Sequence, residues 1–357
     1  MLVKDLIQEY SVRNKEKKDY PVYSVTNSQG FCKDYFGKEV ASKDKSTYKI
    51  VPYGCFAYNP SRINVGSIDW QHCEDFVIVS PLYNVFTVNT NITRQDYLSY
   101  YFKSHLVSDY INTFAKGSVR LNVPLSTLGN FPVPVPPLAE QERIVAELDL
   151  LSSIIDKKKA QLKELDQLAQ SIFYTMFGDP ITNEKGWEVK KLGEACKLMA
   201  GGDVPRERFS KEKTKTYSVP VFSNGIENCG LYGYTDIPKI TEKSITISGR
   251  GTIGFVAKRK EPFYPIIRLI VVTPINDIDI TYLEYYAISM HFDGNGVAIP
   301  QLTVPMIKNV PIPLPPLPLQ QEFASKIEAI ERQKSLIQQS IVETQTLFDS
   351  RMDHWFG

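Results

Sequence analysis

Apolar residues recur at alternating steps of four and three along two long stretches of the chain, residues 144–176 and 323–355. The second stretch repeats the first at an offset of 179, and neither contains Gly or Pro. Such steps align apolar side chains along one side of a helix, so each stretch predicts a coiled-coil helix. Lys158 fills one position of the first seam. The predicted seam residues are Ile144, Leu148, Leu151, Ile155, Leu162, Leu165, Phe323, Ile327, Ile330, Ile337, Ile341 and Phe348.

A long apolar seam must be buried, and the matching seam in this chain is that of the other stretch. We therefore expect the two helices to pack antiparallel and to carry a globular unit at each end. Two alternatives stay open. Each helix could belong to the core of its own domain, or the helices could pair between two copies of the chain.

The segments around these helices are also repeated. FPVPVPPL at 131–138 corresponds to VPIPLPPL at 310–317, again at the offset of 179. YLSYY at 97–101 corresponds to YLEYY at 282–286, now at an offset of 185, so six residues are missing from the second copy. Near the start of each half, Pro21–Ser24 resembles Pro220–Ser223, and Gly66–Ile68 is expected to match Gly251–Ile253. Together these matches indicate a tandem duplication.

The remaining sequence predicts mixed α/β units. Runs such as 76–79 and 266–273 are typical of strands, and Gly- and Pro-rich turns separate them. We therefore expect an α+β (mixed α/β) protein with pseudo-twofold symmetry, made of two globular units and two long antiparallel helices. The predicted divisions are 1–135 for the first unit, 136–178 for the central helix, 179–313 for the second unit and 314–357 for the C-terminal helix.

Composition narrows the class of protein. The 357 residues carry a net charge of +1, and no apolar run approaches the ~18–20 residues of a membrane span. The N-terminal residues lack the pattern of a signal peptide. Five cysteines without a CxxC motif indicate reduced thiols, so we expect a cytoplasmic protein without a disulfide framework or a metal site.

The charge is unevenly distributed. Residues 1–135 have a net charge of +3 and residues 179–313 have +2, whereas 136–178 and 314–357 each have −2. This division favours globular units that face phosphate and helices that face protein.

Two motifs lack the context that their usual functions need. Gly249–Gly254 matches GxGxxG, but a second strand-like run and Glu261-Pro262 follow it where a dinucleotide site needs a helix, so it predicts a hairpin. His72-Cys73-Glu74 matches half of a deaminase signature, and the PCxxC half is absent. No catalytic constellation remains, and we expect no enzyme activity from this chain alone.

Two diverged units, each ending in a proline motif and a helix that starts as PPLAEQE or PPLPLQQE and ends in FG, form a specific pattern. In this pattern the chain resembles the specificity (S) subunit of type I restriction–modification systems over essentially its whole length. Leu319 stands where Glu140 stands in the first copy, so the acidic member of the motif is lost there.

The resemblance implies that each unit is a target-recognition domain that reads one half of a split, asymmetric double-stranded DNA sequence. It also implies that the helices set the distance between half-sites and dock two methyltransferase (M) subunits. S-adenosylmethionine, and the ATP and Mg²⁺ used by additional restriction (R) subunits, would then reside on the partners and not on this chain.

Long polar side chains on loops are the natural readers of base edges. The candidates in the first unit are Asn27, Gln29, Arg62 and Arg120, with Ser67, Lys116 and Ser118 as phosphate contacts. The candidates in the second unit are Arg206, Arg208, Asn224, Arg250 and Arg268. Two rival functions keep the same architecture: a coiled-coil scaffold with two protein-binding domains, and a DNA-binding dimer without enzymatic partners.

Overall fold

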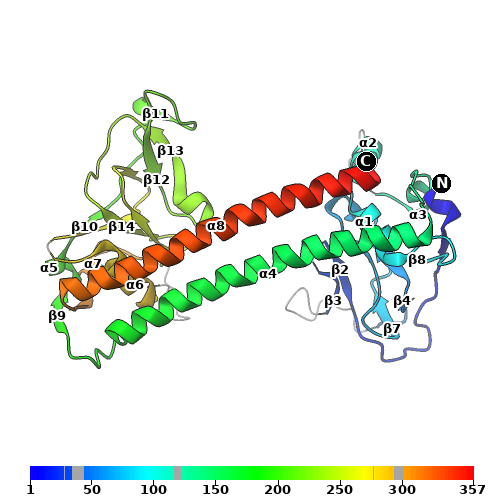
Figure 1. The fold of residues 1–357 in the computed structure, drawn as a ribbon, viewed down its shortest axis with the longest axis horizontal. Coiled ribbons are helices and arrows are strands. Elements are labelled where there is room, and N and C mark those ends of the chain that lie inside the picture. The colour runs from blue at the N-terminus through cyan, green and yellow to red at the C-terminus, as the bar shows by residue number, and fades with distance from the viewer. Residues whose placement is uncertain (28, 34–43, 116–121, 276, 293–300) are drawn as a thin grey trace. The chain divides into compact units, whose positions relative to one another are not determined.

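The computed structural model describes residues 1–27, 29–33, 44–115, 122–275, 277–292 and 301–357. These residues form two compact units (Figure 1). Unit 1 consists of Met1–Lys159 together with Gln339–Gly357, and unit 2 is the continuous segment Ala160–Gln338. Two long helices, α4 (Leu138–Phe177) and α8 (Leu317–Phe356), each contribute one part to unit 1 and the other part to unit 2.

Unit 1 is built on an antiparallel four-stranded sheet with the strand order β1-β8-β5-β6. The chain segments that connect these strands form two further antiparallel strand pairs, β2-β3 and β4-β7. The elements are β1 (Ile7–Glu9), β2 (Ser24–Thr26), β3 (Gly30–Cys32), β4 (Lys49–Pro52), β5 (Phe56–Tyr58), β6 (Ile68–Trp70), β7 (Phe76–Val79), β8 (Asn84–Val88), α1 (Gln95–Phe102), α2 (His105–Ala115) and α3 (Leu125–Leu128), with the short 3₁₀ turns η1 (Val3–Asp5) and η2 (Ile63–Val65).

Unit 2 contains the corresponding sheet in the order β10-β17-β14-β15, a second sheet β11-β13-β12-β16, and the pair β18-β9. The elements are β9 (Glu188–Lys191), α5 (Leu192–Ala195), β10 (Cys196–Ala200), β11 (Phe209–Ser210), β12 (Val219–Phe222), β13 (Leu231–Thr235), β14 (Ser244–Ile247), β15 (Val256–Arg259), β16 (Tyr264–Pro265), β17 (Ile270–Pro274), α6 (Ile280–Ser289), α7 (Val304–Lys308) and β18 (Pro311–Leu314), with the 3₁₀ turns η3 (Arg206–Arg208) and η4 (Glu227–Gly230).

The strand registers confirm the duplication and correct one detail of its alignment. Tyr58 pairs with Ile68 in unit 1 as Ile247 pairs with Val256 in unit 2. Gly66 therefore corresponds to Gly254, and the expected match to Gly251 is wrong. Both glycines have a positive φ, 73° and 83°, so the left-handed turn into the strand is the repeated feature.

Hydrogen bonds join the two repeated sequence motifs in each unit. The hydroxyl of Tyr97 donates to the carbonyl of Pro134 at 2.9 Å, and Tyr282 donates to Pro313 at 2.5 Å. A second tyrosine of each motif repeats the contact one turn later, Tyr101 to Pro132 at 2.9 Å and Tyr286 to Pro311 at 2.7 Å. The six residues that the second copy lacks lie between its tyrosine motif and its proline motif. The tyrosine–proline hydrogen bonds are therefore kept although the offset between the copies changes.

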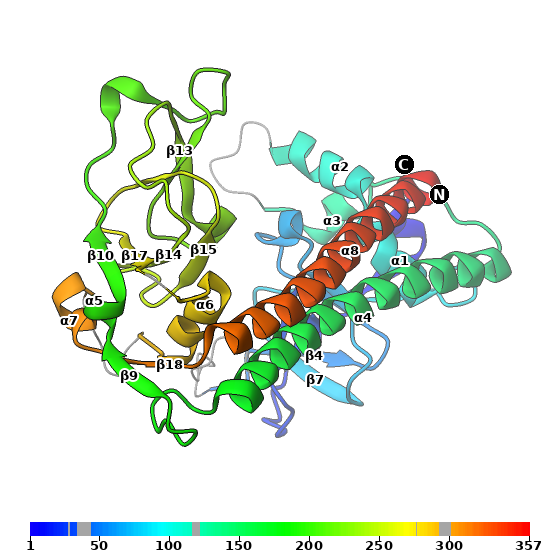
Figure 2. The same cartoon turned by 60° about the vertical axis from the view of Figure 1, so that its left-hand side comes forward.

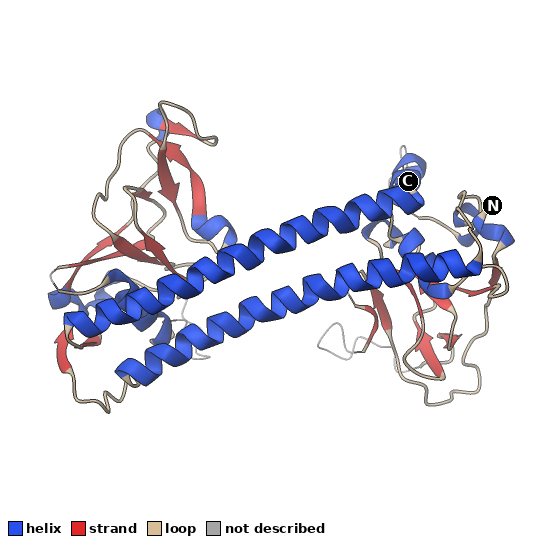
Figure 3. Ribbon diagram, viewed as in Figure 1, coloured by secondary structure: helices blue, strands red, loops and turns tan. Residues whose placement is uncertain are grey.

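The long helices pack antiparallel within each unit. The first part of α4 lies beside the last part of α8 in unit 1, and the last part of α4 lies beside the first part of α8 in unit 2 (Figures 2 and 3). All twelve predicted seam residues are buried or half-buried. The predicted fold class, a mixed α/β tandem repeat with two long antiparallel helices, is confirmed.

The ends of the helices complete the cores of the units. Phe356, at the end of α8, is 1% exposed and packs on Tyr97 of unit 1 with ring centroids 5.1 Å apart. Phe177, at the end of α4, packs on Tyr282 of unit 2 at 4.8 Å. Each helix therefore begins beside one globular core and ends inside the other.

Candidate nucleic-acid interface

In unit 1 the predicted readers gather where the β2–β3 turn meets the connection from β5 to β6. Asn27 and Gln29 are exposed on the turn, and exposed Arg62 precedes η2 on the connection. A Cβ on Gly66 would lie 2.5 Å from Asn27 Oδ1, so glycine lets the two segments approach. Ser67, which follows, is only 7% exposed, and this leaves it little surface for the predicted phosphate contact.

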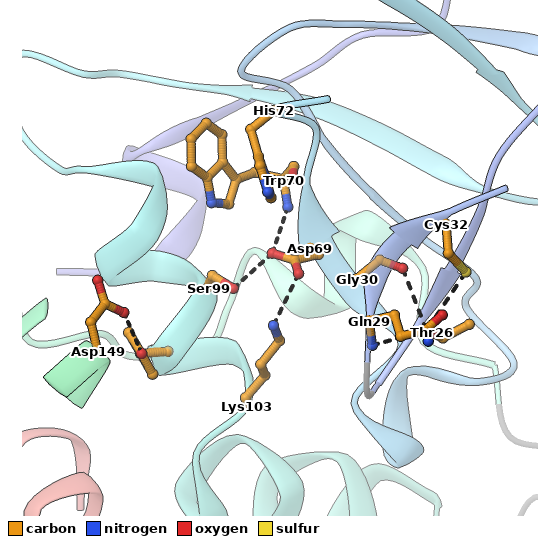
Figure 4. A network of polar contacts seen from close by, with 11 residues as sticks. Thr26, Gln29, Gly30, Cys32, Asp69, Trp70, His72, Ser99, Lys103 and Asp149 are labelled. Atoms are coloured by element: carbon orange, nitrogen blue, oxygen red, sulfur yellow. Dashed lines mark hydrogen bonds and ion pairs between the residues drawn. The ribbon is translucent and has the colours of Figure 1, made fainter. Parts of the chain in front are cut away.

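A buried carboxylate holds this region in place (Figure 4). Asp69 of β6 is 7% exposed and accepts a hydrogen bond from Ser99 Oγ at 2.8 Å. Its other oxygen pairs with Lys103 Nζ at 3.0 Å, which fastens α1 to the edge of the sheet. Gly30, with φ of 59°, packs against the same carboxylate, so Asp69 also fixes the start of β3 beside the Asn27–Gln29 turn.

Unit 2 makes the equivalent attachment with different groups. Lys258 of β15 pairs with Glu284 of α6 at 2.8 Å, and both side chains are 16% exposed. The neighbouring Arg259 is 7% exposed and lies over the ring of Phe222, 3.6 Å from its centroid. Burial lowers the pKa of Arg259 to about 10. Sequence reasoning missed these supports, because the run of charges in Lys258–Lys260 resembles a solvated strand face.

Three of the predicted readers in unit 2 meet at one group of loops. Asn224 donates from Nδ2 to the carbonyl of Ile267 at 2.6 Å and accepts at Oδ1 from the backbone N–H of Gly249 at 2.8 Å. Both ends of the Asn224 amide are therefore engaged within the protein, so this side chain braces the loops around it. Asn224 thereby positions Arg250, which follows Gly249, and Arg268, which follows Ile267.

Arg250 and Arg268 themselves are exposed. Arg250 donates to Gln301 Oε1 at 2.9 Å. A Cβ on Gly249 would lie 2.8 Å from the carbonyl oxygen of Leu302 and 3.3 Å from that of Arg268. The absence of a side chain on Gly249 therefore lets its loop pack closely against the backbone of both Leu302 and Arg268. The GxGxxG segment forms the turn between antiparallel β14 and β15, and the predicted hairpin is confirmed.

The other predicted readers lie elsewhere. Arg206 and Arg208 form η3, which leads into the edge strand β11. Arg208 binds Asp236 with Nη2 at 2.6 Å and Nε at 3.0 Å, and this hydrogen-bonded guanidinium holds the pKa of Asp236 below its usual value. Lys116, Ser118 and Arg120 lie outside the described residues.

Among the residues that the structure describes, no group of three or more His, Cys, Asp or Glu side chains could hold a metal ion. Within the same part of the chain, none of the helices has the length and apolar character that a membrane crossing requires.

Comparison with known proteins adds the following relations. A Mycoplasma pneumoniae protein named as a type I specificity subunit is 32% identical over 211 residues, 56% of this chain and 63% of the relative. The type I restriction enzyme MjaIX specificity subunit of Methanocaldococcus jannaschii is 27% identical over 268 residues, 66% of this chain and 62% of the relative. The chain thus spans less than two thirds of the length of either relative.

Solved structures share the fold. One chain comes from a structure that concerns complex assembly and conformational transition of the type I R-M system. It has a TM-score of 0.65 at 20% identity, and the match covers 100% of this chain and 96% of that chain. The S subunit of a type I restriction–modification system from M. genitalium has a TM-score of 0.58 at 13% identity, with 100% and 95% coverage. Residues 4–167 and 184–345 both match the family described as the type I restriction modification DNA specificity domain, and this chain therefore belongs to that family.

Proposed function

We propose that the protein is the sequence-specific DNA-recognition subunit of a type I restriction–modification complex. Each unit reads one half of a bipartite, asymmetric double-stranded DNA site, and the long helices set the distance between the halves. Two units with a common fold and different loops suit this task, because half-sites at a fixed spacing require two similarly placed readers with different contacts.

The observation that carries the proposal is the repetition of the framework without repetition of the loops. Both units keep the same strand order and the same tyrosine–proline hydrogen bonds. The exposed arginines differ: Arg62 precedes η2 in unit 1, whereas Arg250 and Arg268 meet around Gly249 in unit 2. A scaffold that holds two different sets of cationic loops supports the reading of two different sequences.

The outer faces of the helices support the docking of two copies of one partner. Leu168 on α4 and Leu347 on α8 occupy equivalent positions of the repeat, and each is 48% exposed. Leucines exposed at equivalent places suit a protein surface that is used twice. We assign these faces to two methyltransferase subunits.

The chemistry then belongs to the partners. S-adenosylmethionine binds to the methyltransferase subunits, and ATP and Mg²⁺ bind to the restriction subunits. The five cysteines are free thiols, which supports work in the reducing cytoplasm. In this assignment the present chain is non-catalytic.

The test is co-expression of the full chain with methyltransferase and restriction subunits of a type I system from the same genome, followed by affinity purification and mapping of methylated adenines on genomic DNA. We expect the methyltransferase to co-purify and methylation to occupy one bipartite sequence with two fixed half-sites. A complex that forms but leaves every bipartite sequence unmethylated would favour the scaffold function and contradict the proposal.

Single substitutions in the helices test the docking faces. Leu168→Glu and Leu347→Glu should each reduce the methyltransferase bound per chain from two copies to one, measured by native mass spectrometry. Lys163→Glu, an exposed position on the same helix, serves as the control.

A further inference from the structure

Both units expose an aliphatic side chain on the same connection of the fold. Residues 80–83 link β7 to β8, and residues 266–269 link β16 to β17, so both connections have four residues. Leu82 on the first is 72% exposed, and Ile267 on the second is 48% exposed. A single exposed aliphatic residue is ordinary on a protein surface. Leu82 is the third residue of its connection and Ile267 is the second, so the units share an exposed aliphatic side chain on the same turn and not at one aligned position.

Ile267 is held in an unfavourable backbone conformation. Its φ is 50° and that of Arg268 is 55°, a left-handed region that a β-branched residue rarely adopts. Three contacts impose it: the N–H of Ile267 donates to the carbonyl of Gly202 at 2.8 Å, its carbonyl accepts from Asn224, and Gly249 packs against the carbonyl of Arg268. Strain that the surroundings impose in this way is typical of functional loops.

The turn in unit 1 is also anchored from both sides. Tyr83 accepts the N–H of Val25 at its hydroxyl, 3.4 Å away, and its carbonyl accepts from Lys49 Nζ at 2.6 Å. These bonds fix the residue that follows Leu82, so the leucine is presented from a braced turn rather than from a loose loop.

Ile267 is followed directly by an exposed cation, Arg268. Unit 1 also carries an exposed arginine, Arg62, on the connection from β5 to β6. Across the described ranges of the chain, neither Arg62 nor Arg268 forms an ion pair. Arginines without acidic partners are suited to phosphate or guanine, so the charge favours nucleic acid over an apolar protein partner.

We propose that Leu82 and Ile267 are specificity-determining residues that make apolar contacts with thymine methyl groups, one in each half-site, while Arg268 beside Ile267 contacts phosphate or guanine. The thymine methyl is the apolar feature that the major groove displays, and aliphatic side chains are its usual readers. Asn224 is then a positioning residue that acts through Ile267. The inference rests on the proposed function and extends it to individual readers.

The experiment uses the full chain in complex with the methyltransferase subunits and a library of duplexes in which each half-site is randomised. Leu82→Ala should reduce discrimination about tenfold at one or two base pairs of one half-site, and Ile267→Ala should do the same in the other half-site only. Val12→Ala in unit 1 and Ile181→Ala in unit 2 remove other exposed aliphatic side chains and should leave both half-sites unchanged.

Ile267→Gly separates reading from folding. Glycine tolerates a positive φ, so this variant should melt at the same temperature as the wild-type chain or higher. It should nevertheless lose discrimination as Ile267→Ala does. Asn224→Ala should give the same half-site defect, because the turn loses its brace.

Three outcomes would contradict these expectations in different ways. A wild-type complex that selects no bipartite site overturns the proposed function itself. A wild-type complex that selects one, with Leu82→Ala and Ile267→Ala leaving both half-site profiles intact, overturns only the assignment of the readers. Variants that lose the methyltransferase while the remaining complex keeps its half-site preferences assign the turns to protein contact instead.

Discussion

Gln141 and Gln320 occupy equivalent places near the start of each long helix, and they are 0% and 1% exposed. Gln141 uses its whole amide: Nε2 donates to two backbone carbonyls, and Oε1 accepts two hydrogen bonds. The partners are the carbonyls of Ile92 and Pro136 at 3.0 and 2.8 Å, the N–H of Arg94 at 2.9 Å and Thr93 Oγ1 at 3.1 Å. One side chain thus ties the helix to its proline motif and to the segment before α1.

Replacing the Gln141 side chain should lower the stability of the fold without altering the exposed loops. Gln141→Ala should lower the free energy of unfolding by about 3 kcal/mol, because buried donors and acceptors are left without partners. Gln141→Glu should cost at least as much, since a carboxylate cannot donate to two carbonyls. Chemical denaturation measures both. Gln161→Ala, exposed on the same helix, should change stability little, and an equal loss there would contradict the role of Gln141.

The buried thiols predict an alkaline loss of stability. Burial raises the pKa of Cys55 to about 11 and that of Cys196 to about 12, from 9.0. Above pH 9 the thiols of the unfolded chain release protons that the folded chain keeps. The contribution of these thiols to the free energy of unfolding is therefore fully present below pH 9 and is lost as the pH rises toward these values. Each thiol contributes up to about 1.4 kcal/mol per pH unit.

Thermal unfolding between pH 8 and 11 measures this effect. The double variant Cys55→Ala and Cys196→Ala should show a shallower decline with pH than the wild-type chain. Cys73→Ala removes an exposed thiol and should leave the slope unchanged. If stability declined equally with pH in the wild-type chain, the double variant and Cys73→Ala, the effect would not come from the buried cysteines.

Residue chemistry predicts which side chains can read DNA, but it does not predict which are free to do so. Asn224 has the right amide and the structure uses it as a brace, while Ser67 has the right hydroxyl and the structure buries it. Gln141 looks like a polar surface position at the start of a helix, and its role depends on backbone groups of Ile92 and Arg94 from a distant part of the chain. Those partners are set by tertiary packing, which one sequence does not encode position by position.

At the scale of elements, the part of the helix seam that lies in unit 1 contains a polar layer at Lys158. Lys158 lies among apolar seam residues and donates from Nζ to Ser340 Oγ at 2.7 Å, to Thr344 Oγ1 at 2.8 Å and to the carbonyl of Ser340 at 3.2 Å. All these groups belong to unit 1. A polar residue with matched partners in a coiled-coil seam costs stability and favours one register over others.

Lys158→Ile should therefore stabilise the chain by about 1 kcal/mol and weaken its preference for a single helix pairing. The repeat supports the substitution, because Ile337 occupies the equivalent position of α8. Thermal unfolding measures the first effect, and analytical ultracentrifugation measures the second as new dimers with helices paired between chains. A destabilised, strictly monomeric variant would show that the lysine contributes by packing and not by selecting the register.

The elements differ in how well the sequence predicts them. A four-three repeat over more than four heptads leaves one structure for the long helices, and the burial of their seams follows. The apolar run 266–273 predicts one strand, but β17 begins only at Ile270 because Ile267 and Arg268 adopt a left-handed turn. That turn is imposed by Asn224 and Gly202 from other loops, and local hydrophobicity carries no sign of it.

At the scale of the whole molecule, the division into units respects the duplication. The boundary falls after Lys159 in α4 and after Gln338 in α8, which are equivalent positions of the repeat. Both lie in helices, so the chain passes between the units as continuous helix and not as a flexible linker. Under the proposed function, helix length therefore determines the spacing between the two half-sites.

Inserting one heptad at both boundaries should lengthen the spacer of the recognised site and leave both half-site sequences unchanged. Seven residues at 1.5 Å per residue add about 10 Å, close to three base pairs. A heptad preserves the seam, whereas a four-residue insertion is a stutter that locally unwinds the helix pair. Methylation mapping of the complex measures the spacer. Altered half-sites with an unchanged spacer would contradict the role of the helices.

The discontinuity of unit 1 has a consequence for the order in which a ribosome-bound chain can fold. The core of unit 1 includes Met352 and Phe356, whereas unit 2 needs nothing beyond Gln338. Domains generally fold as units during synthesis, so unit 2 should become protease-resistant on stalled nascent chains while unit 1, although made earlier, remains cleavable. Resistance of unit 1 should appear only after Phe356 has left the exit tunnel. Unit 2, which is translated later than most of unit 1, is thus expected to complete its fold first.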